Sequence, residues 1–232
     1  MKIGIQGELG AYSHIATNNL YKDAEIKTCS TFEETFKQAF QDENYKIIIP
    51  IENSLAGRVA DIHHLLPKYK LQIHGEFFLN VEHNLLCKPE ASIEDIEYVR
   101  SHAQAIGQCQ NIINKKKFKP IISADTAGSA KDLAEGDDKS IAAIASELSA
   151  QIYKLKILKK NIEDEKGNVT RFLIMGKNVE QPEFKSGKKY ITSCIFRLKS
   201  EPSALYKCLG GFATNQINLT KLESFSVKNT FD

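Results

Sequence analysis

Four short polar segments carry residues that could hold a small anion. Each segment follows an apolar run typical of a strand and precedes an expected helix. Backbone N–H groups are free at a helix start and the helix dipole is positive there, which favours a carboxylate. Taken singly, each segment is more readily explained by helix capping, but four together favour a shared cleft. The segments are Gly7 to Ser13, Glu52 to Ser54, Ser101 to Gln104, and Asp125 to Ser129.

A few further side chains could take part in chemistry, but each has an ordinary explanation. His83 is polar on an apolar strand face, where a histidine is more often a core residue held by one hydrogen bond. Thr170 is a common strand residue, and the neighbouring Arg171 could be a surface charge. Cys109 and His102 suggest a thiol nucleophile only weakly, because no neighbour in the sequence activates the thiol.

Alternating strands and helices must position these residues. Short apolar runs alternate with stretches of helical period, which predicts an α/β fold with mostly parallel strands and ligands at their carboxyl ends. The stretch from Leu71 to Cys87 has a period of two and is long enough to cross between two lobes. The residues alone therefore predict a two-lobed α/β protein that binds a small anion.

The expected elements follow in chain order. The expected strands are Lys2–Gln6, Tyr45–Ile51, Leu71–Cys87, Tyr98–Ser101, Pro120–Ser123, Ser140–Ala145, Leu155–Asn161, Thr170–Met175, Tyr190–Leu198 and Ile217–Val227. The expected helices are Tyr12–Leu20, one opened by the capping box at Thr31, Ala103–Lys116, Ala127–Ala134, Ser146–Tyr153, and one from Glu201 to Thr214. Residues 181–189 are expected to form a linker.

Composition excludes several classes of protein. The chain has 232 residues with 31 basic and 29 acidic side chains, so its net charge of +2 attracts neither nucleic acid nor membrane. Five separated cysteines form no C-x-x-C pair, and no metal site or cofactor is predicted. The chain opens directly on a strand and has no apolar run of roughly 20 residues, so we expect a cytoplasmic protein.

The polar segments also carry the motifs of a known family. Together with one run after residue 167, they resemble the prephenate dehydratase family, and five motifs in this order are specific to it. The motifs are Gly7-Glu8-Leu9-Gly10-Ala11-Tyr12-Ser13, Pro50-Ile51-Glu52-Asn53-Ser54-Leu55-Ala56-Gly57, Ser101-His102-Ala103-Gln104-Ala105, Asp125-Thr126-Ala127-Gly128-Ser129-Ala130 and Asn168-Val169-Thr170-Arg171-Phe172.

The resemblance implies a fold and an activity. It implies a catalytic unit over residues 1–180 similar to type II periplasmic binding proteins, with lobe 1 at about 1–76 and 155–180 and lobe 2 at about 77–154. It implies a partial ACT domain, a ferredoxin-like α+β unit, over residues 190–232. The implied activity is dehydration and decarboxylation of prephenate to phenylpyruvate in phenylalanine biosynthesis. Arogenate dehydration and non-enzymatic binding of a small carboxylate are the alternatives.

The resemblance also implies residue roles. Thr170, His83 and Glu52 are the implied catalytic residues. The implied substrate contacts are Asn53, Ser54, Ser101, His102, Gln104, Gln108, Thr126, Arg171 and Phe172. Phenylalanine, as an allosteric ligand, is expected to contact Ala204, Leu205, Asn218, Leu219, Glu223 and Ser224, and the family's assembly implies a homodimer or homotetramer.

Two positions of the tail depart from the family pattern. Ser203 stands where the family usually has glycine, and Phe225-Ser226 stands where the family continues Arg-Pro. The sequence up to Asp232 covers the first expected strand, the helix and the second expected strand of an ACT unit, and two strands with one helix are marginally stable on their own.

Overall fold

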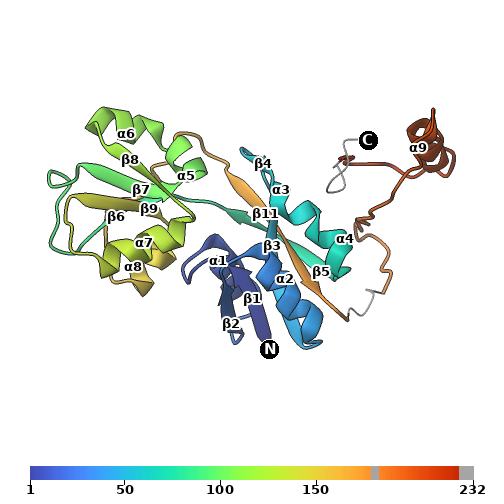
Figure 1. The fold of residues 1–232 in the computed structure, drawn as a ribbon, viewed down its shortest axis with the longest axis horizontal. Coiled ribbons are helices and arrows are strands. Elements are labelled where there is room, and N and C mark those ends of the chain that lie inside the picture. Colours follow the sequence, from blue (N-terminus) through green and yellow to red (C-terminus); the bar gives the residue numbers. More distant parts are fainter. Residues whose placement is uncertain (179–182, 225–232) are drawn as a thin grey trace. The chain divides into compact units, whose positions relative to one another are not determined.

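The protein is described by a computed structural model that covers residues 1–178 and 183–224. The chain divides into two units, Met1–Gln181 and Pro182–Asp232, and each is described by itself. Unit 1 contains two β-sheets with helices packed against them (Figure 1). Within the described ranges, no helix has both the length and the apolar character needed to cross a bilayer.

The first sheet forms lobe 1, in the strand order β2-β1-β3-β11-β5 with β4 paired to β3. Strands β1, β2 and β3 are parallel, and β11 runs antiparallel between β3 and β5. Its elements are β1 (Lys2–Gln6), α1 (Tyr12–Leu20), β2 (Glu25–Cys29), α2 (Phe32–Gln41), β3 (Tyr45–Asn53), β4 (Gly57–Arg58), α3 (Ala60–His63), α4 (Leu65–Tyr69), β5 (Gln72–Asn80) and β11 (Val169–Gly176).

Strand β3 lies in the centre of lobe 1 because its apolar side chains are buried on both faces. Ile47 and Ile49 pack with Phe36 of α2 on one side of the sheet. Ile48 packs with Ala16 of α1 on the other side. This confirms the expectation that the isoleucine-rich run forms a strand covered on both faces.

The second sheet forms lobe 2, in the strand order β10-β6-β9-β7-β8. Strand β7 is parallel to β8 and β9, whereas β6 runs antiparallel to β9 and β10. Its elements are β6 (Asn84–Cys87), β7 (Tyr98–His102), α5 (Ala103–Gly107), α6 (Gln110–Lys116), β8 (Lys119–Ser123), α7 (Thr126–Glu135), β9 (Ile141–Ala145), α8 (Glu147–Ile152) and β10 (Lys156–Lys159). The predicted two-lobed α/β class is thereby confirmed.

The chain crosses between the lobes twice, and the crossings correct two expected boundaries. The run from Leu71 to Cys87 does enter both lobes, but as two strands, β5 and β6, rather than one (Figure 1). The break falls at 81–83, where the backbone N–H of Val81 binds the carbonyl of Asn168 in the returning crossing. Strand β10, expected in lobe 1, pairs with β6 and so belongs to lobe 2.

The single helix expected from Ala103 to Lys116 is interrupted near Gln108. The carbonyl oxygen of Gln108 accepts a hydrogen bond from the backbone N–H of Asp164, at 2.7 Å. The carboxylate of Asp164 in turn accepts the backbone N–H of Asn111, at 3.0 Å, and so caps the start of α6. The returning crossing therefore provides tertiary partners that end one helix and begin the next.

Unit 2 contains α9 (Ala204–Thr214), which confirms the expected helix. Within residues 183–224 no strand is formed, so the strand expected at Tyr190–Leu198 is not found, and part of the second expected strand, 225–227, lies outside the described residues. An isolated strand leaves its backbone groups without partners, and residues 183–224 provide no neighbouring strand with which 190–198 could pair. The partial ACT domain therefore remains a proposal.

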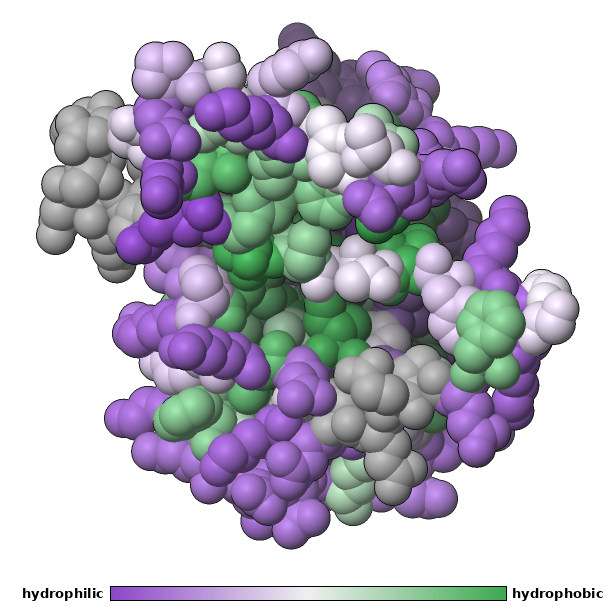
Figure 2. Space-filling view, turned by 90° about the vertical axis from the view of Figure 1, so that its right-hand side faces the viewer, coloured by the Kyte–Doolittle hydropathy of each residue, from purple (hydrophilic) through white to green (hydrophobic). Residues whose placement is uncertain are grey.

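Unit 2 exposes apolar residues such as Ile191, Tyr206 and Ile217. The face drawn in Figure 2 likewise has apolar side chains gathered among hydrophilic ones.

Ser203 precedes α9 with a φ of 68°, in the left-handed region that favours glycine. This backbone conformation fits the glycine that the family resemblance leads us to expect at position 203.

Candidate active site

Asn53, the last residue of β3, anchors the candidate site. Its side-chain oxygen accepts the backbone N–H groups of Leu55, at 3.0 Å, and Ala56, at 2.9 Å. A backbone N–H can only donate, so these two bonds determine which side of the Asn53 amide is oxygen. Its nitrogen Nδ2 must therefore face β11, where it donates to Asn168 Oδ1 at 2.6 Å and to Thr170 Oγ1 at 2.9 Å.

The Thr170 hydroxyl is left with a hydrogen that it can donate. Thr170 lies directly opposite Asn53 in the β3–β11 pairing, and it is 8% exposed. Its oxygen accepts the Asn53 N–H, and a hydroxyl that accepts still has its own proton to donate. The site therefore offers a neutral hydroxyl donor, the kind of group that stabilises negative charge growing on a ligand oxygen.

The hydrogen-bond network continues from Asn168 into lobe 2. Because Asn168 Oδ1 accepts from Asn53, its Nδ2 is the donor to Gln108 Oε1, at 2.8 Å. Gln108 Oε1 also lies 2.9 Å from His83 Nε2. An oxygen that already accepts from Asn168 can only accept again, so His83 must carry its proton on Nε2. The backbone donors at Leu55 and Ala56 thus determine the donor and acceptor roles as far as His83.

His83 is held neutral. It is 3% exposed, and burial lowers the pKa of its imidazole, against smaller raising effects from the Gln108 hydrogen bond and from the charge of Glu163. The Glu163 carboxylate accepts the His83 backbone N–H at 3.0 Å. His83 therefore serves as a hydrogen-bonding member of the network rather than as a charged acid.

Stability is expected to decrease as pH falls from 7.5 to 5.5. His83, His14 and His74 all have a folded pKa lowered by burial, so the unfolded chain takes up protons at a higher pH than the folded one. The folded state is then favoured above the ordinary histidine pKa, about 6.5, and loses that advantage as pH falls through it. Urea unfolding at pH 7.5, 6.5 and 5.5 gives the slope of the unfolding free energy against pH. His83→Asn should reduce the slope, and an unchanged slope would contradict the assignment to His83.

The structure places Ser54 beside Thr170 through the backbone. The Ser54 hydroxyl donates to the carbonyl of Gly167 at 3.1 Å and accepts the backbone N–H of Val169 at 2.9 Å. The Ser54 backbone N–H binds the carbonyl of Val169 at 2.8 Å. Ser54 thus holds the segment that leads into Thr170.

Glu52 and Arg171 lie away from Thr170. Glu52 immediately precedes Asn53 in β3, and Arg171 immediately follows Thr170 in β11. The two residues are register partners in the β3–β11 pairing. Successive strand residues point to opposite faces, so this pair lies on the other side of the sheet from Asn53 and Thr170. The Arg171 guanidinium is also paired with the Glu76 carboxylate, at 2.6 Å. The pairing does not support the implied role of Glu52 beside Thr170.

Three further implied substrate contacts have their side chains engaged within the fold. Phe172 is 1% exposed and packs with Ile3 in the core, so it is not a substrate contact in this structure. Ser101 is fully buried and donates to the carbonyl of Ile144 at 2.7 Å. His102 caps α5, where its Nδ1 accepts the N–H of Gln104 at 3.2 Å, as the capping alternative predicts.

The remaining implied contacts lie at helix starts of lobe 2. Gln104 is exposed in the first turn of α5, and Thr126 is the first residue of α7. Asp125 caps α7 by accepting the N–H of Gly128 at 2.6 Å. No group of three or more potential metal-ligating side chains occurs within residues 1–178 and 183–224.

The glycine-rich segment Gly7 to Ser13 forms an interlobe contact instead of an open anion site. The carbonyl of Gly10 accepts the hydroxyls of Ser146, at 2.6 Å, and Ser149, at 3.1 Å. Tyr153 donates to the carbonyl of Leu9 at 2.9 Å. The segment therefore fastens lobe 1 to α8 of lobe 2.

Gly10→Ala is expected to destabilise unit 1 by about 2–4 kcal/mol. Gly10 has a φ of 93°, and an added Cβ would lie 2.8 Å from the Cα of Ser149. Gly57→Ala is the matched control, because its φ of 78° is similar but nothing lies within 4 Å of its Cβ. Urea unfolding of both variants measures the difference. Equal losses would show that backbone strain alone matters and that the interlobe contact does not.

Two residues of the network were missed as site residues by sequence reasoning. Asn168 opens the fifth motif and connects Asn53 to Gln108, but an asparagine in a charged loop carries no sequence signal for that role. Tyr12 lies in the first motif and was read only as part of a helix start.

Comparison with known proteins identifies the family. The family model described as prephenate dehydratase matches residues 3–180. The chain belongs to the prephenate dehydratase family. A Komagataeibacter europaeus protein named bifunctional N-acyl-homoserine lactone acylase/prephenate dehydratase is 38% identical over 99% of this chain and 81% of its own length. Chloroplastic arogenate dehydratase/prephenate dehydratase 2 of Arabidopsis thaliana is 39% identical over 97% of this chain, which spans 58% of that protein.

A solved structure supports the fold of this prephenate dehydratase family member. The Arthrobacter aurescens prephenate dehydratase in complex with L-Phe aligns with a TM-score of 0.88 over 100% of this chain and 77% of that one, at 23% identity. Identity this low supports the fold alone. The family match, in contrast, covers the stretch that contains Asn53, His83, Gln108, Asn168 and Thr170.

Proposed function

We propose that this protein converts prephenate into phenylpyruvate. The bond between the ring and its carboxylate breaks, and CO2 leaves. The electron pair of that bond enters the ring, the C–O bond to the ring hydroxyl breaks, and the departing hydroxide takes up a proton to become water. The prephenate dianion and one proton thus give phenylpyruvate, CO2 and water. Because the ring becomes aromatic, the enzyme mainly has to orient the substrate and stabilise the departing oxygen.

The observation that carries the proposal is the free hydrogen of the Thr170 hydroxyl. The Asn53 amide donates to the Thr170 hydroxyl oxygen, so the hydroxyl hydrogen remains available. It can be donated to the departing oxygen as negative charge grows there. A threonine hydroxyl is too weak an acid to give up its proton outright. Its proposed role is therefore a hydrogen bond that strengthens in the transition state. The match to the prephenate dehydratase family supports this choice of substrate.

The experiment is direct turnover of prephenate by the purified chain. Phenylpyruvate and CO2 should form in equal amounts, and the Thr170→Val variant should form both at least about 100-fold more slowly. Binding of prephenate without turnover by the wild-type chain would contradict the proposal and favour a non-enzymatic carboxylate-binding protein.

Arogenate is a second candidate substrate. It differs from prephenate by an amino group in place of the side-chain keto group, and the Arabidopsis relative carries both activities in its name. The network around Thr170 concerns the departing ring oxygen, which the two substrates share. A competition assay with both substrates decides between them: phenylpyruvate in excess supports prephenate, and phenylalanine in excess supports arogenate.

We further propose that unit 2 binds L-phenylalanine, in a cytoplasmic homodimer or homotetramer. A hollow of about 400 Å³ in unit 2 is lined in part by Ala204 and Leu205, two of the implied regulatory residues. The Arthrobacter structure, which shares this fold, is a complex with L-Phe, and L-phenylalanine is therefore the ligand to test first. Calorimetric titration with L-phenylalanine and light scattering test the two parts. Absence of binding heat for the wild-type chain, or a monomeric mass, would contradict the corresponding part.

A further inference from the structure

The network that begins at Thr170 has one more member beyond His83. The hydroxyl of Tyr12, the first residue of α1, lies 2.8 Å from His83 Nδ1. The two rings meet edge to face, with centroids 5.7 Å apart and an angle of 76° between their planes. Tyr12 therefore contacts the imidazole nitrogen opposite the one that faces Gln108.

The direction of the Tyr12–His83 bond follows from the rest of the network. The backbone donors at Leu55 and Ala56 orient Asn53, and that orientation propagates through Asn168 and Gln108. His83 then carries its proton on Nε2, and its Nδ1 presents a lone pair. A donor satisfies this lone pair, and the Tyr12 hydroxyl can act as that donor by sharing its single hydrogen between His83 Nδ1 and the carbonyl of Glu82.

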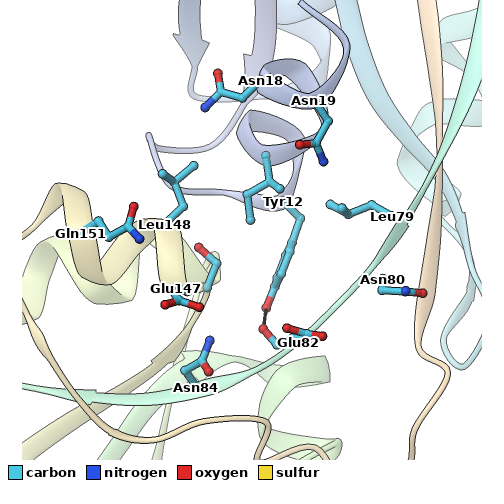
Figure 3. Close-up of a pocket in the computed structure, with 12 residues that line it drawn as sticks. Tyr12, Asn18, Asn19, Leu79, Asn80, Glu82, Asn84, Glu147, Leu148 and Gln151 are labelled. Atoms are coloured by element: carbon cyan, nitrogen blue, oxygen red, sulfur yellow. Dashed lines mark hydrogen bonds between the residues drawn. The ribbon is translucent and has the colours of Figure 1, made fainter. Parts of the chain in front are cut away.

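The surroundings of Tyr12 support a constant donor. Its hydroxyl also donates to the carbonyl oxygen of Glu82, at 2.9 Å, so its single hydrogen is shared between two acceptors. Figure 3 shows the Tyr12 ring extending toward Glu82, with that bond marked, at the edge of a cavity of about 450 Å³. Burial raises the pKa of Tyr12 well above its usual range, so the hydroxyl keeps its proton.

We infer that Tyr12 is a positioning residue: its hydroxyl favours the Nε2–H tautomer of His83, which keeps Gln108 bonded to Asn168 and so supports the end of the network at Asn53 and Thr170. The inference rests on the proposed function only for its kinetic consequence. If Tyr12 lost its hydroxyl, either imidazole nitrogen could carry the proton. In the tautomer with the proton on Nδ1, the bare Nε2 would face Gln108 Oε1, so that amide would turn and disturb Asn168.

Tyr12→Phe is the test, with Tyr153→Phe as the matched control. Each variant removes one tyrosine hydroxyl that donates across the lobes to a backbone carbonyl, but only Tyr12 contacts His83. The first readout is the ¹⁵N chemical shifts of the His83 imidazole at pH 7.5, assigned by comparison with His83→Asn. The wild-type chain and Tyr153→Phe should show one Nε2–H tautomer, and Tyr12→Phe a mixture.

The second readout is the kinetics of prephenate turnover. In Tyr12→Phe, kcat should fall about tenfold while KM changes about twofold at most, because orientation of Thr170 affects the transition state more than substrate binding. Tyr12→Phe should have no additional effect on kcat in a His83→Asn background. An unchanged tautomer and kcat in Tyr12→Phe would overturn the inference, as would an equal loss in Tyr153→Phe. If the wild-type chain does not turn over prephenate, the proposed function fails, whereas the tautomer comparison still tests the role of Tyr12.

Discussion

Thr170→Val is expected to lower kcat for prephenate by at least about 100-fold, the usual cost of removing one donor to a developing oxyanion. Valine has nearly the shape of threonine and suits a strand, so β11 should form as before. The Asn53 amide nitrogen keeps its bond to Asn168, and its second N–H loses the Thr170 acceptor. The substitution therefore removes the hydroxyl donor and its bond to Asn53, and steady-state kinetics with prephenate measure the loss.

Thr170→Ser is the control for the hydroxyl itself. Serine keeps the oxygen and its hydrogen and loses only a methyl group, so kcat should stay within about fivefold of the wild-type value, the loss reflecting a less restricted side chain. Circular dichroism and the unfolding midpoint of both variants establish that the fold is retained. Near-normal turnover by folded Thr170→Val would end the proposed role of Thr170.

Asn53→Asp is expected to reduce kcat by about 100-fold or more, although aspartate has almost the same shape. One carboxylate oxygen can still accept the N–H groups of Leu55 and Ala56. The other oxygen has no hydrogen, so it cannot donate to Thr170 or Asn168. The Thr170 hydroxyl would then donate to this carboxylate, and its hydrogen would no longer be available to the substrate.

The control for Asn53→Asp is Asn44→Asp, the same substitution at an exposed position of lobe 1. It adds the same charge and should leave kcat unchanged. Asn53→Ala, which removes both the acceptor and the donor, should lose the turn after β3 as well and unfold at lower urea. If Asn53→Asp keeps wild-type kcat, the amide nitrogen does not set the orientation of Thr170, and the directional argument for the network fails at its origin.

Local patterns predicted the elements well where a single strand or helix decides its own form. The isoleucine run of β3 is buried on both faces, and Thr31 caps α2 by accepting the N–H of Glu34 at 3.1 Å. Misplaced boundaries arose where a distant segment supplies the partner. Asp164 interrupts the helix after Gln108, and Asn168 helps divide β5 from β6 through Val81.

The sequence by itself determined the α/β class, the family and the importance of the run from Asn168 to Phe172, because these depend on residue types in order along the chain. Only the tertiary structure divided that run into separate roles. Thr170 faces Asn53, Arg171 is paired with Glu76, and Phe172 lies in the core. Strand geometry alternates the side chains, but which face is buried and which partner is present depends on β3 and β5 on either side.

The same reason explains why Tyr12 was read only as part of a helix start. Its position in the first motif carries no information about a histidine 71 residues later in the chain. Folding places α1 against the first crossing and the second crossing against β3, so that four side chains, His83, Gln108, Asn168 and Asn53, connect Tyr12 to Thr170. Hydrogen-bond direction is a property of the whole network, and it is set by two backbone N–H groups after Asn53 that no residue pattern identifies.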